Sequence, residues 1–439
     1  MVLVLRIKKR DSISILESLT GGVVPPRGLH HIMVGRTQEA EQILKDLQNV
    51  QAGSSMIKFF IGDYGSGKSF MQGLVKQVGL EKDFVVTQAD FTTNKRLNGG
   101  GYALPLYTEL INNLSIKTFP EGNALSILMD EWITQIQKKV KEEGNYTKID
   151  FSNLDFVKDI EKKVVSEVVE MDTLAGGYDF SHILNIYFKG FIEEDIDIQR
   201  KALRWLRGEY GTKTEARKDL GVRNIINDDN YYSYLKVFVQ FVKQIGYSGL
   251  VINLDEAVNL YKINHPLSRE RNYETILSIY NDCLQGTVEG FYFTFSGTSD
   301  FLKDDRRGLY SYGALRRRLE VNRYETEEHR DLSQPVIQLI PLKQEELFVL
   351  LQRVRDIHAH HYQYQSNIED KEIKTFIIQE FSLPGAEHYT TVGHIIKRFL
   401  DALNILMSNP SIDRQQIFNK KDIQSEEEKP DIMDRFSIT

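Results

Sequence analysis

Short, uninterrupted apolar runs recur along this chain, separated by stretches in which apolar residues follow a helical spacing. The runs lie at residues 56–61, 84–87, 249–254, 291–295 and 334–339. Runs of this length are typical of strands buried on both faces of a sheet, and the second run leads to a strand end at Asp90. Strands that alternate with helices predict an α/β fold, in which helices cover both faces of a mostly parallel sheet.

Two long regions lack such runs and show helical spacing instead. Residues 115–240 carry long charged helical patterns, and residues 343–408 also have a helical pattern throughout. We therefore expect a helical insertion inside the α/β core and a helical subdomain after it. The predicted organisation is a leader at 1–30, a core at 31–114 and 241–340, the insertion at 115–240, the helical subdomain at 341–410 and a charged tail at 411–439.

Composition narrows the classes of protein to which the chain can belong. Of its 439 residues, 41% are hydrophobic and 27% are charged, which is ordinary for a soluble globular protein. No apolar run approaches the roughly 20 residues of a membrane span, and the first residues do not form a secretion signal. The single cysteine, Cys283, excludes an internal disulfide and favours a cytoplasmic protein. A net charge of −7 argues against nucleic-acid binding over the whole surface and leaves a local basic groove open.

The strongest chemical signal is the segment 62–69, GDYGSGKS, which fits the phosphate-binding loop pattern G-x-x-x-x-G-K-[ST]. It follows the apolar run 56–61 and precedes a helical pattern at 70–78. This order places backbone N–H groups and a helix N-terminus around phosphate groups. Lys68 would reach the β- and γ-phosphates, and the Ser69 hydroxyl would ligate Mg²⁺.

A second motif closes the run at 249–254, where Asp255 and Glu256 follow the strand. In the same chain as a phosphate-binding loop, this pair is typical of a Walker B motif. Asp255 would hold Mg²⁺ through its water shell, and Glu256 would act as the general base toward the attacking water. The presence of Glu256 favours hydrolysis over nucleotide sensing alone.

Polar residues also follow the run at 291–295. Ser296 and Thr298 are candidates for the sensor position that contacts the γ-phosphate or the attacking water, with capping of the turn as the alternative. Arg316, Arg317 and Arg318 are consecutive, and one of them could reach the γ-phosphate of a neighbouring subunit. Surface charge explains these arginines equally well.

Two further clusters favour ordinary structural roles. The basic stretch 200–223 is expected to be a solvated helix face, with a phosphate-contacting surface as the alternative. His358, His360 and His361 lack the spacing of a known metal-ligand set, so we expect no metal there.

With both nucleotide motifs placed, the chain resembles AAA+ ATPases of the ORC/Cdc6-like branch. More narrowly, the segments 61–70, 202–222, 246–262 and 291–301 resemble ATP-binding proteins of BREX-type bacterial phage-defence systems. The resemblance implies that Gly35 and Arg36 form an entry motif around adenine and that residues 341–410 form a lid over ATP. Two features depart from the branch, because the lid lacks a clear sensor 2 arginine near 391–398 and too few residues follow it for a winged helix.

The expected protein is thus an Mg²⁺-dependent ATPase, a P-loop NTPase of AAA+ type with a helical insertion and a helical lid. By resemblance it acts in phage defence as a homo-oligomer with other defence proteins, with DNA contact left open and no membrane contact. The alternatives are a nucleotide-controlled assembly switch with little turnover and a structural adaptor. The expected catalytic residues are Lys68, Glu256, Ser296, Thr298, Arg316 and Arg317. The expected nucleotide-binding residues are Gly35, Arg36, Gly62, Asp63, Tyr64, Gly65, Ser66, Gly67, Lys68, Ser69 and Phe70, and the expected metal ligands are Ser69 and Asp255.

Overall fold

The computed structural model describes residues 7–151, 153–172, 175–326, 328–382, 391–414 and 417. Most of the charged tail expected at 411–439 lies outside these residues. The chain forms two compact units, residues 36–341 and residues 1–35 together with 342–439. We describe each unit by itself.

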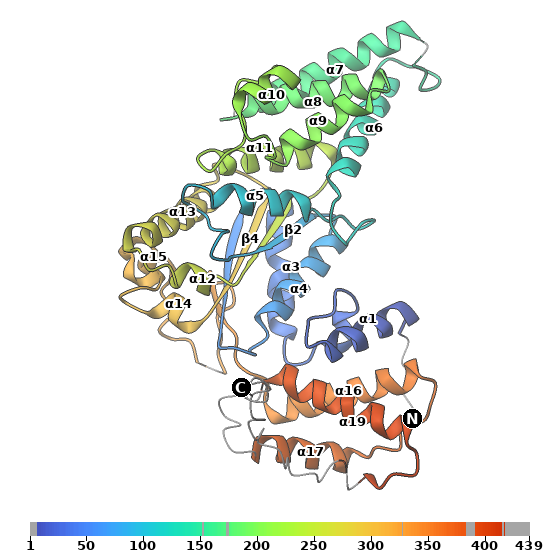
Figure 1. Cartoon of the computed structure of the whole chain (residues 1–439), viewed down its shortest axis with the longest axis vertical. Coiled ribbons are helices and arrows are strands. Elements are labelled where there is room, and N and C mark those ends of the chain that lie inside the picture. The colour runs from blue at the N-terminus through green and yellow to red at the C-terminus, as the bar shows by residue number, and fades with distance from the viewer. Residues whose placement is uncertain are drawn as a thin grey trace, which may run out of the picture. The chain divides into compact units, whose positions relative to one another are not determined.

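The larger unit contains a five-stranded sheet. Its strands are β1 (Met56–Ile61), β2 (Val85–Asp90), β3 (Leu250–Asp255), β4 (Phe291–Gly297) and β5 (Val336–Gln338). Their order is β2-β3-β4-β1-β5, and every neighbouring pair is parallel. This sheet, with helices around it, confirms the predicted α/β class (Figure 1).

Register brings the carboxyl ends of four strands to one edge of the sheet. Asp90 lies opposite Asp255, and Ile61 lies opposite Gly297. Almost all side chains of the five strands are buried. The rings of Phe59 and Phe295 stack with centroids 5.1 Å apart. Because the chain leaves the neighbouring strands β4 and β1 in opposite directions across the sheet, this edge is where an open α/β sheet binds its ligands.

Helices cover the sheet on two sides, as Figure 1 shows. Those near the strands are α3 (Thr37–Gln51), α4 (Lys68–Glu81), α5 (Ala103–Asn112), α12 (Val258–Tyr261), α13 (Pro266–Gln285), α14 (Ser299–Lys303) and α15 (Gly313–Leu319). Local sequence sets several of their ends. α13 begins with Pro266 after a His265 cap and ends at Gly286, whose φ of 66° suits glycine.

The segment between β2 and β3 adds a layer of helices to this unit. Besides α5, it contains α6 (Leu125–Glu143), α7 (Leu154–Asp172), α8 (Gly177–Ile192), α9 (Ile196–Leu206), α10 (Lys213–Leu220) and α11 (Tyr231–Ile245). Trp132 and Phe180 pack edge-on against Phe241 of α11, and Trp205 packs against Tyr234. One hydrophobic core runs continuously from the sheet into these helices.

The smaller unit is helical throughout its described part. It contains α1 (Lys9–Thr20), α2 (Leu29–Ile32), α16 (Gln344–His361), α17 (Asp370–Ser382) and α19 (Val392–Ser408). α1, which falls in the segment expected as a leader, packs against α16 and α19.

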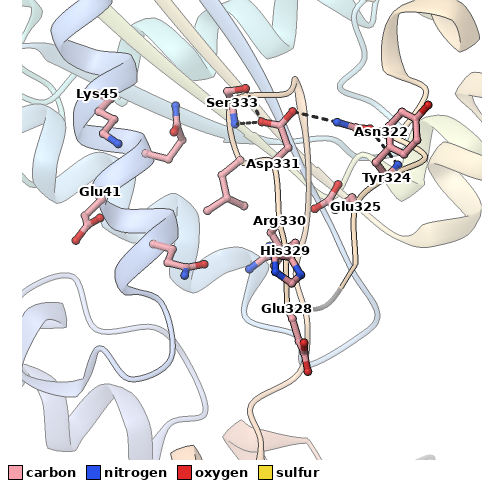
Figure 2. Close-up of a pocket in the computed structure, with 13 residues that line it drawn as sticks. Glu41, Lys45, Asn322, Tyr324, Glu325, Glu328, His329, Arg330, Asp331 and Ser333 are labelled. Carbon is pink, nitrogen blue, oxygen red and sulfur yellow. Dashed lines mark hydrogen bonds between the residues drawn. The ribbon is translucent and has the colours of Figure 1, made fainter.

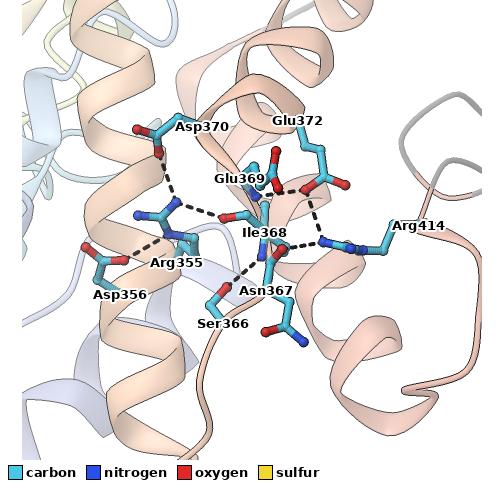
Figure 3. A network of polar contacts seen from close by, with 9 residues as sticks. All are labelled: Arg355, Asp356, Ser366, Asn367, Ile368, Glu369, Asp370, Glu372 and Arg414. Atoms are coloured by element: carbon cyan, nitrogen blue, oxygen red, sulfur yellow. Dashed lines mark hydrogen bonds and ion pairs between the residues drawn. The ribbon is translucent and has the colours of Figure 1, made fainter. Parts of the chain in front are cut away.

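A polar network holds the junction between α16 and α17 (Figure 3). Arg355 donates to the Ile368 carbonyl at 3.0 Å and pairs with Asp370 at 3.0 Å. Arg414 reaches Glu372 at 3.4 Å and also donates to the Asn367 carbonyl. Two arginines therefore bind neighbouring carbonyls of this connection from opposite sides (Figure 3).

None of the described helices combines the length and the apolar character that crossing a bilayer requires.

Candidate nucleotide site

The segment 62–69 forms a tight turn between β1 and α4. β1 ends at Ile61, and α4 begins at Lys68. Gly65 and Gly67 have φ values of 82° and 91°, a region that glycine occupies without strain. A Cβ on Gly62 would lie 2.5 Å from Ser66 Oγ, so a larger residue there would displace the turn. The sequence thus builds a turn at a helix N-terminus, where backbone N–H groups and the helix dipole attract anions.

Polar side chains of the turn are arranged for a polyphosphate. Lys68 Nζ donates to the carbonyls of Gly62 at 2.9 Å and Asp63 at 2.8 Å, so its charge lies on the turn itself. Burial lowers the pKa of Lys68, although the carboxylates around it act in the opposite direction. Ser66 Oγ is buried and has no hydrogen-bond partner among the described residues. An unpaired buried hydroxyl beside a lysine fits the oxygen-rich groups of a nucleotide.

Asp255 connects three elements at the carboxyl edge of the sheet. Its Oδ2 accepts a hydrogen bond from Ser69 Oγ of α4 at 3.0 Å, and its Oδ1 accepts one from Ser296 Oγ of β4. Hydroxyl and carboxylate oxygens beside a phosphate-binding turn are the ligands that Mg²⁺ prefers, so these residues fit that ion. Within the described residues, no cluster of three or more His, Cys, Asp or Glu side chains could hold a metal.

Glu256 has a strained backbone directly after Asp255. Its φ is 56°, and its amide donates to Asp255 Oδ1 at 2.7 Å. A non-glycine residue in this region costs about 1–3 kcal/mol, and such residues concentrate at functional sites. The chain turns sharply at Glu256, whose side chain is exposed at the carboxyl edge of the sheet.

Asp90 is a neighbouring carboxylate to which the sequence analysis gave no role. It ends β2 directly opposite Asp255 in the sheet register. Although the Asp90 side chain is exposed, desolvation by the surrounding protein and the charges of Asp255, Glu109 and Glu256 raise its pKa, and the charge of Lys95 acts in the opposite direction. The signal in the sequence was an acid at the end of a second strand, but its proximity to Asp255 depends on strand order.

The two sensor candidates have different surroundings. Ser296 is fully buried and donates to Asp255, so its hydroxyl belongs to the acidic edge. Thr298 caps α14, where its Oγ1 accepts from the Phe301 amide at 3.3 Å. The next residue, Ser299, reaches Asp63 of the turn at 3.5 Å.

The three arginines of α15 also differ in their contacts. Arg316 pairs with Asp305 at 2.9 Å, and Arg318 donates to the Ala314 carbonyl at 3.0 Å. Arg317 is exposed and has no hydrogen bond or ion pair with any described residue.

The remaining candidates are two residues of the predicted entry motif, one side chain of the turn and one of α4. Arg36 is 5% exposed and donates to the Ser66 carbonyl at 2.9 Å, which places it against the turn. Gly35 belongs to the smaller unit, where its φ is 67° and an added Cβ would lie 2.5 Å from Glu346 Oε1. Tyr64 is 90% exposed at the apex of the turn, and Phe70 is half-buried in α4.

A comparison with known protein families agrees with this arrangement. The family model described as BREX system ATP-binding protein BrxC/D matches residues 7–422. The chain belongs to this family. Membership supports ATP as a ligand of the protein and connects the protein to the BREX phage-defence system. No curated protein matches the chain.

The clusters outside this site have local partners. His358 is buried and bonds Tyr364 at 2.9 Å and Asn404 at 3.0 Å, both within the smaller unit. In the basic stretch, Arg204 pairs with Glu215 at 2.6 Å and Lys201 pairs with Asp197 at 2.7 Å. These pairs neutralise part of the charge that could otherwise attract phosphates.

Proposed function

We propose that the chain hydrolyses ATP with Mg²⁺ and uses turnover to change its association with other proteins of a bacterial phage-defence system. The observation that carries the proposal is the convergence on Asp255. Ser69 of the phosphate-binding turn, Ser296 of the neighbouring strand and the Asp255 carboxylate meet within hydrogen-bond distance, and Glu256 follows directly. This set matches what hydrolysis requires, whereas binding alone requires only the turn.

Each residue then has one role. Lys68 and the amides of the turn hold the β- and γ-phosphates, so the developing charge meets fixed donors. Ser69 and Asp255 would hold Mg²⁺, which would neutralise phosphate charge when bound. Ser296 keeps the Asp255 carboxylate in place. Glu256 takes the proton of the attacking water, because its carboxylate is exposed beside the site.

We further propose that the protein works in the cytoplasm as a homo-oligomer. The exposed Arg317 favours this, because its guanidinium is available for the γ-phosphate of a neighbouring copy. An assembly switch with slow turnover is the alternative. DNA contact is a separate question, which turnover measured with and without DNA would answer.

The test is a Glu256→Gln variant. Because a general base contributes typically about 10²–10⁴-fold, phosphate release should fall at least about 100-fold while ATP affinity stays near that of the unmodified protein. Glu274→Gln, at an exposed position of α13, is the matched control. Lys68→Ala supplies the reference for lost binding. Full turnover in Glu256→Gln would refute the assigned base.

A further inference from the structure

A buried carboxylate beneath the phosphate-binding turn is shared by two arginines. Glu39 of α3 is 2% exposed, and its Oε1 lies 2.7 Å from Arg330 Nη1 and 3.3 Å from Arg36 Nη1. The side chains of Arg36 and Arg330 are 6% and 10% exposed. Such charges interact strongly because little water screens them, so the position of each guanidinium depends on Glu39.

Arg36 connects this group to the turn. Its Nη2 donates to the Ser66 carbonyl at 2.9 Å and to the Ile340 carbonyl at 2.6 Å. In a planar trans peptide, the C=O and the following N–H point in opposite directions. Holding the Ser66 carbonyl toward Arg36 therefore directs the Gly67 N–H away from Arg36. An N–H group with a fixed direction is what phosphate recognition at this turn requires.

Arg330 connects the same carboxylate to the segment between α15 and β5, whose described residues 320–326 and 328–333 we call the 320–333 loop. Its Nη2 donates to the Gln338 carbonyl at 2.7 Å. With α3, the loop lines a groove of about 580 Å³, with Glu41 and Lys45 on the α3 side and Tyr324 and His329 on the loop side (Figure 2). Hydrogen bonds of Asn322, Tyr324 and Thr326 stay within the loop. Arg330 thus ties the loop to α3, while Lys58 of β1 holds the end of the loop through the carbonyls of Leu332 and Ser333.

We propose that Glu39 is a positioning residue that couples the phosphate-binding turn to the 320–333 loop. Through Arg36 it sets the direction of the Ser66–Gly67 peptide, and through Arg330 it holds one wall of the groove. A nucleotide bound through the Gly67 N–H favours the arrangement in which Arg36 holds the Ser66 carbonyl and pairs with Glu39, which also leaves Glu39 in place for Arg330. The groove should therefore be more ordered when nucleotide is bound than when it is absent. This inference rests on the proposed ATP binding.

Hydrogen exchange followed by mass spectrometry tests the coupling in the full chain, with Mg²⁺ and the non-hydrolysable analogue AMP-PNP as the probe. In the unmodified protein, the analogue should slow exchange in the turn at 62–70 and in the 320–333 loop. In Arg330→Gln, Glu39 still pairs with Arg36. Affinity and protection of the turn should then persist within about threefold, while the protection of the loop is lost.

Glu39→Gln removes the shared charge from both arginines. Affinity for the analogue should fall at least about tenfold, because hydrogen bonds to charged groups are lost at the turn. Glu270→Gln, at an exposed position of α13 outside the groove, is the control and should behave like the unmodified protein. Thermal unfolding of each variant separates weaker binding from lost structure.

The outcomes separate this inference from the proposed function. If the unmodified protein binds and hydrolyses ATP while exchange in the 320–333 loop does not respond, the coupling is refuted and the function stands. Loop protection that persists in Arg330→Gln also refutes the coupling. If the unmodified protein binds no nucleotide, both proposals fail. A reduced affinity of Arg330→Gln equal to that of Glu39→Gln would show general destabilisation and would overturn the assigned roles.

Discussion

Like charges crowd the carboxyl edge of the sheet, where Asp90 and Asp255 end neighbouring strands and Glu256 follows. No hydrogen bond from another described residue reaches the Asp90 carboxyl, whereas two hydroxyls reach Asp255. A carboxylate in this position costs the folded state free energy until a cation arrives. Asp90 is therefore suited to help retain a divalent ion or an arginine at this edge.

The pH dependence of stability tests this view of Asp90. Its pKa is raised in the folded protein, so its contribution favours folding below the usual pKa of an aspartate and is lost as pH rises through the raised value. Asp90→Asn should therefore increase the free energy of unfolding at pH 7, with a gain that shrinks toward pH 4. Urea unfolding at several pH values measures it. Asp401→Asn, an exposed position in α19, is the control. An equal gain at every pH would contradict the charge argument.

Sequence reasoning at the residue scale worked where the chemistry is local. Residues 62–69 are consecutive, and Asp255 with Glu256 follows an apolar run, so each group is recognisable without the fold. Asp90, Glu39 and Arg330 gave no such signal, because their partners are far along the chain. Strand register and side-chain direction decide which acid meets which arginine, and neither follows from spacing alone.

At the scale of elements, β1 contains a lysine in its buried interior. Lys58 is 1% exposed and donates to the carbonyls of Leu332 at 2.9 Å, Ser333 at 2.9 Å and Gln334 at 2.8 Å. It also lies 3.5 Å from Asp46 of α3. Burial lowers the pKa of Lys58 and raises that of Asp46, and each partner opposes the shift of the other. Lys58 thereby fixes the end of the 320–333 loop to the sheet.

Lys58→Met should decrease the free energy of unfolding by about 3–5 kcal/mol, because it leaves the Asp46 charge buried without its partner. Replacing both residues, Lys58→Met with Asp46→Leu, should recover part of the loss, since no unpaired charge then remains. Lys45→Met, at an exposed position of α3, should have little effect. Denaturant unfolding measures all three. A single variant that unfolds like the unmodified protein would show that the pair adds nothing.

The sequence predicted the strands but not the buried position of Lys58. Buried parallel strands need apolar runs, and all five runs coincide with strands to within a few residues. Lys58 interrupts the run MIKFFI without changing its structure, because three carbonyls and a carboxylate meet its ammonium group. Those partners come from other segments, so the sequence of β1 alone could not reveal them.

At the scale of the whole molecule, the question is how copies of the chain combine. Arg317 of α15 has no hydrogen bond or ion pair with a described residue, whereas Arg316 is paired with Asp305. An arginine supplied by a neighbour contributes about 10³–10⁵ in rate in enzymes that use one. If this protein does, the active unit contains at least two copies.

Mixing two inactive variants tests the arrangement. Arg317→Ala should bind ATP normally yet hydrolyse it at least about 100-fold more slowly, because the neighbouring γ-phosphate loses its guanidinium. Lys68→Ala should fail to bind ATP while keeping its Arg317. Phosphate release should recover partly when the two are mixed, and Arg316→Ala serves as the control. Absence of recovery, or full activity of Arg317→Ala alone, would count against action between subunits.

The order of strands also bears on how the protein is made. β1 pairs with β4 and β5 alone, and both follow the whole helical insertion in the chain. Translation proceeds at about 5–20 residues per second, so β1 waits on the order of ten seconds or more beside the ribosome without a pairing partner. During that interval an apolar edge is open to other nascent chains. Production of this protein should therefore be sensitive to chaperone supply and to the speed of the ribosome.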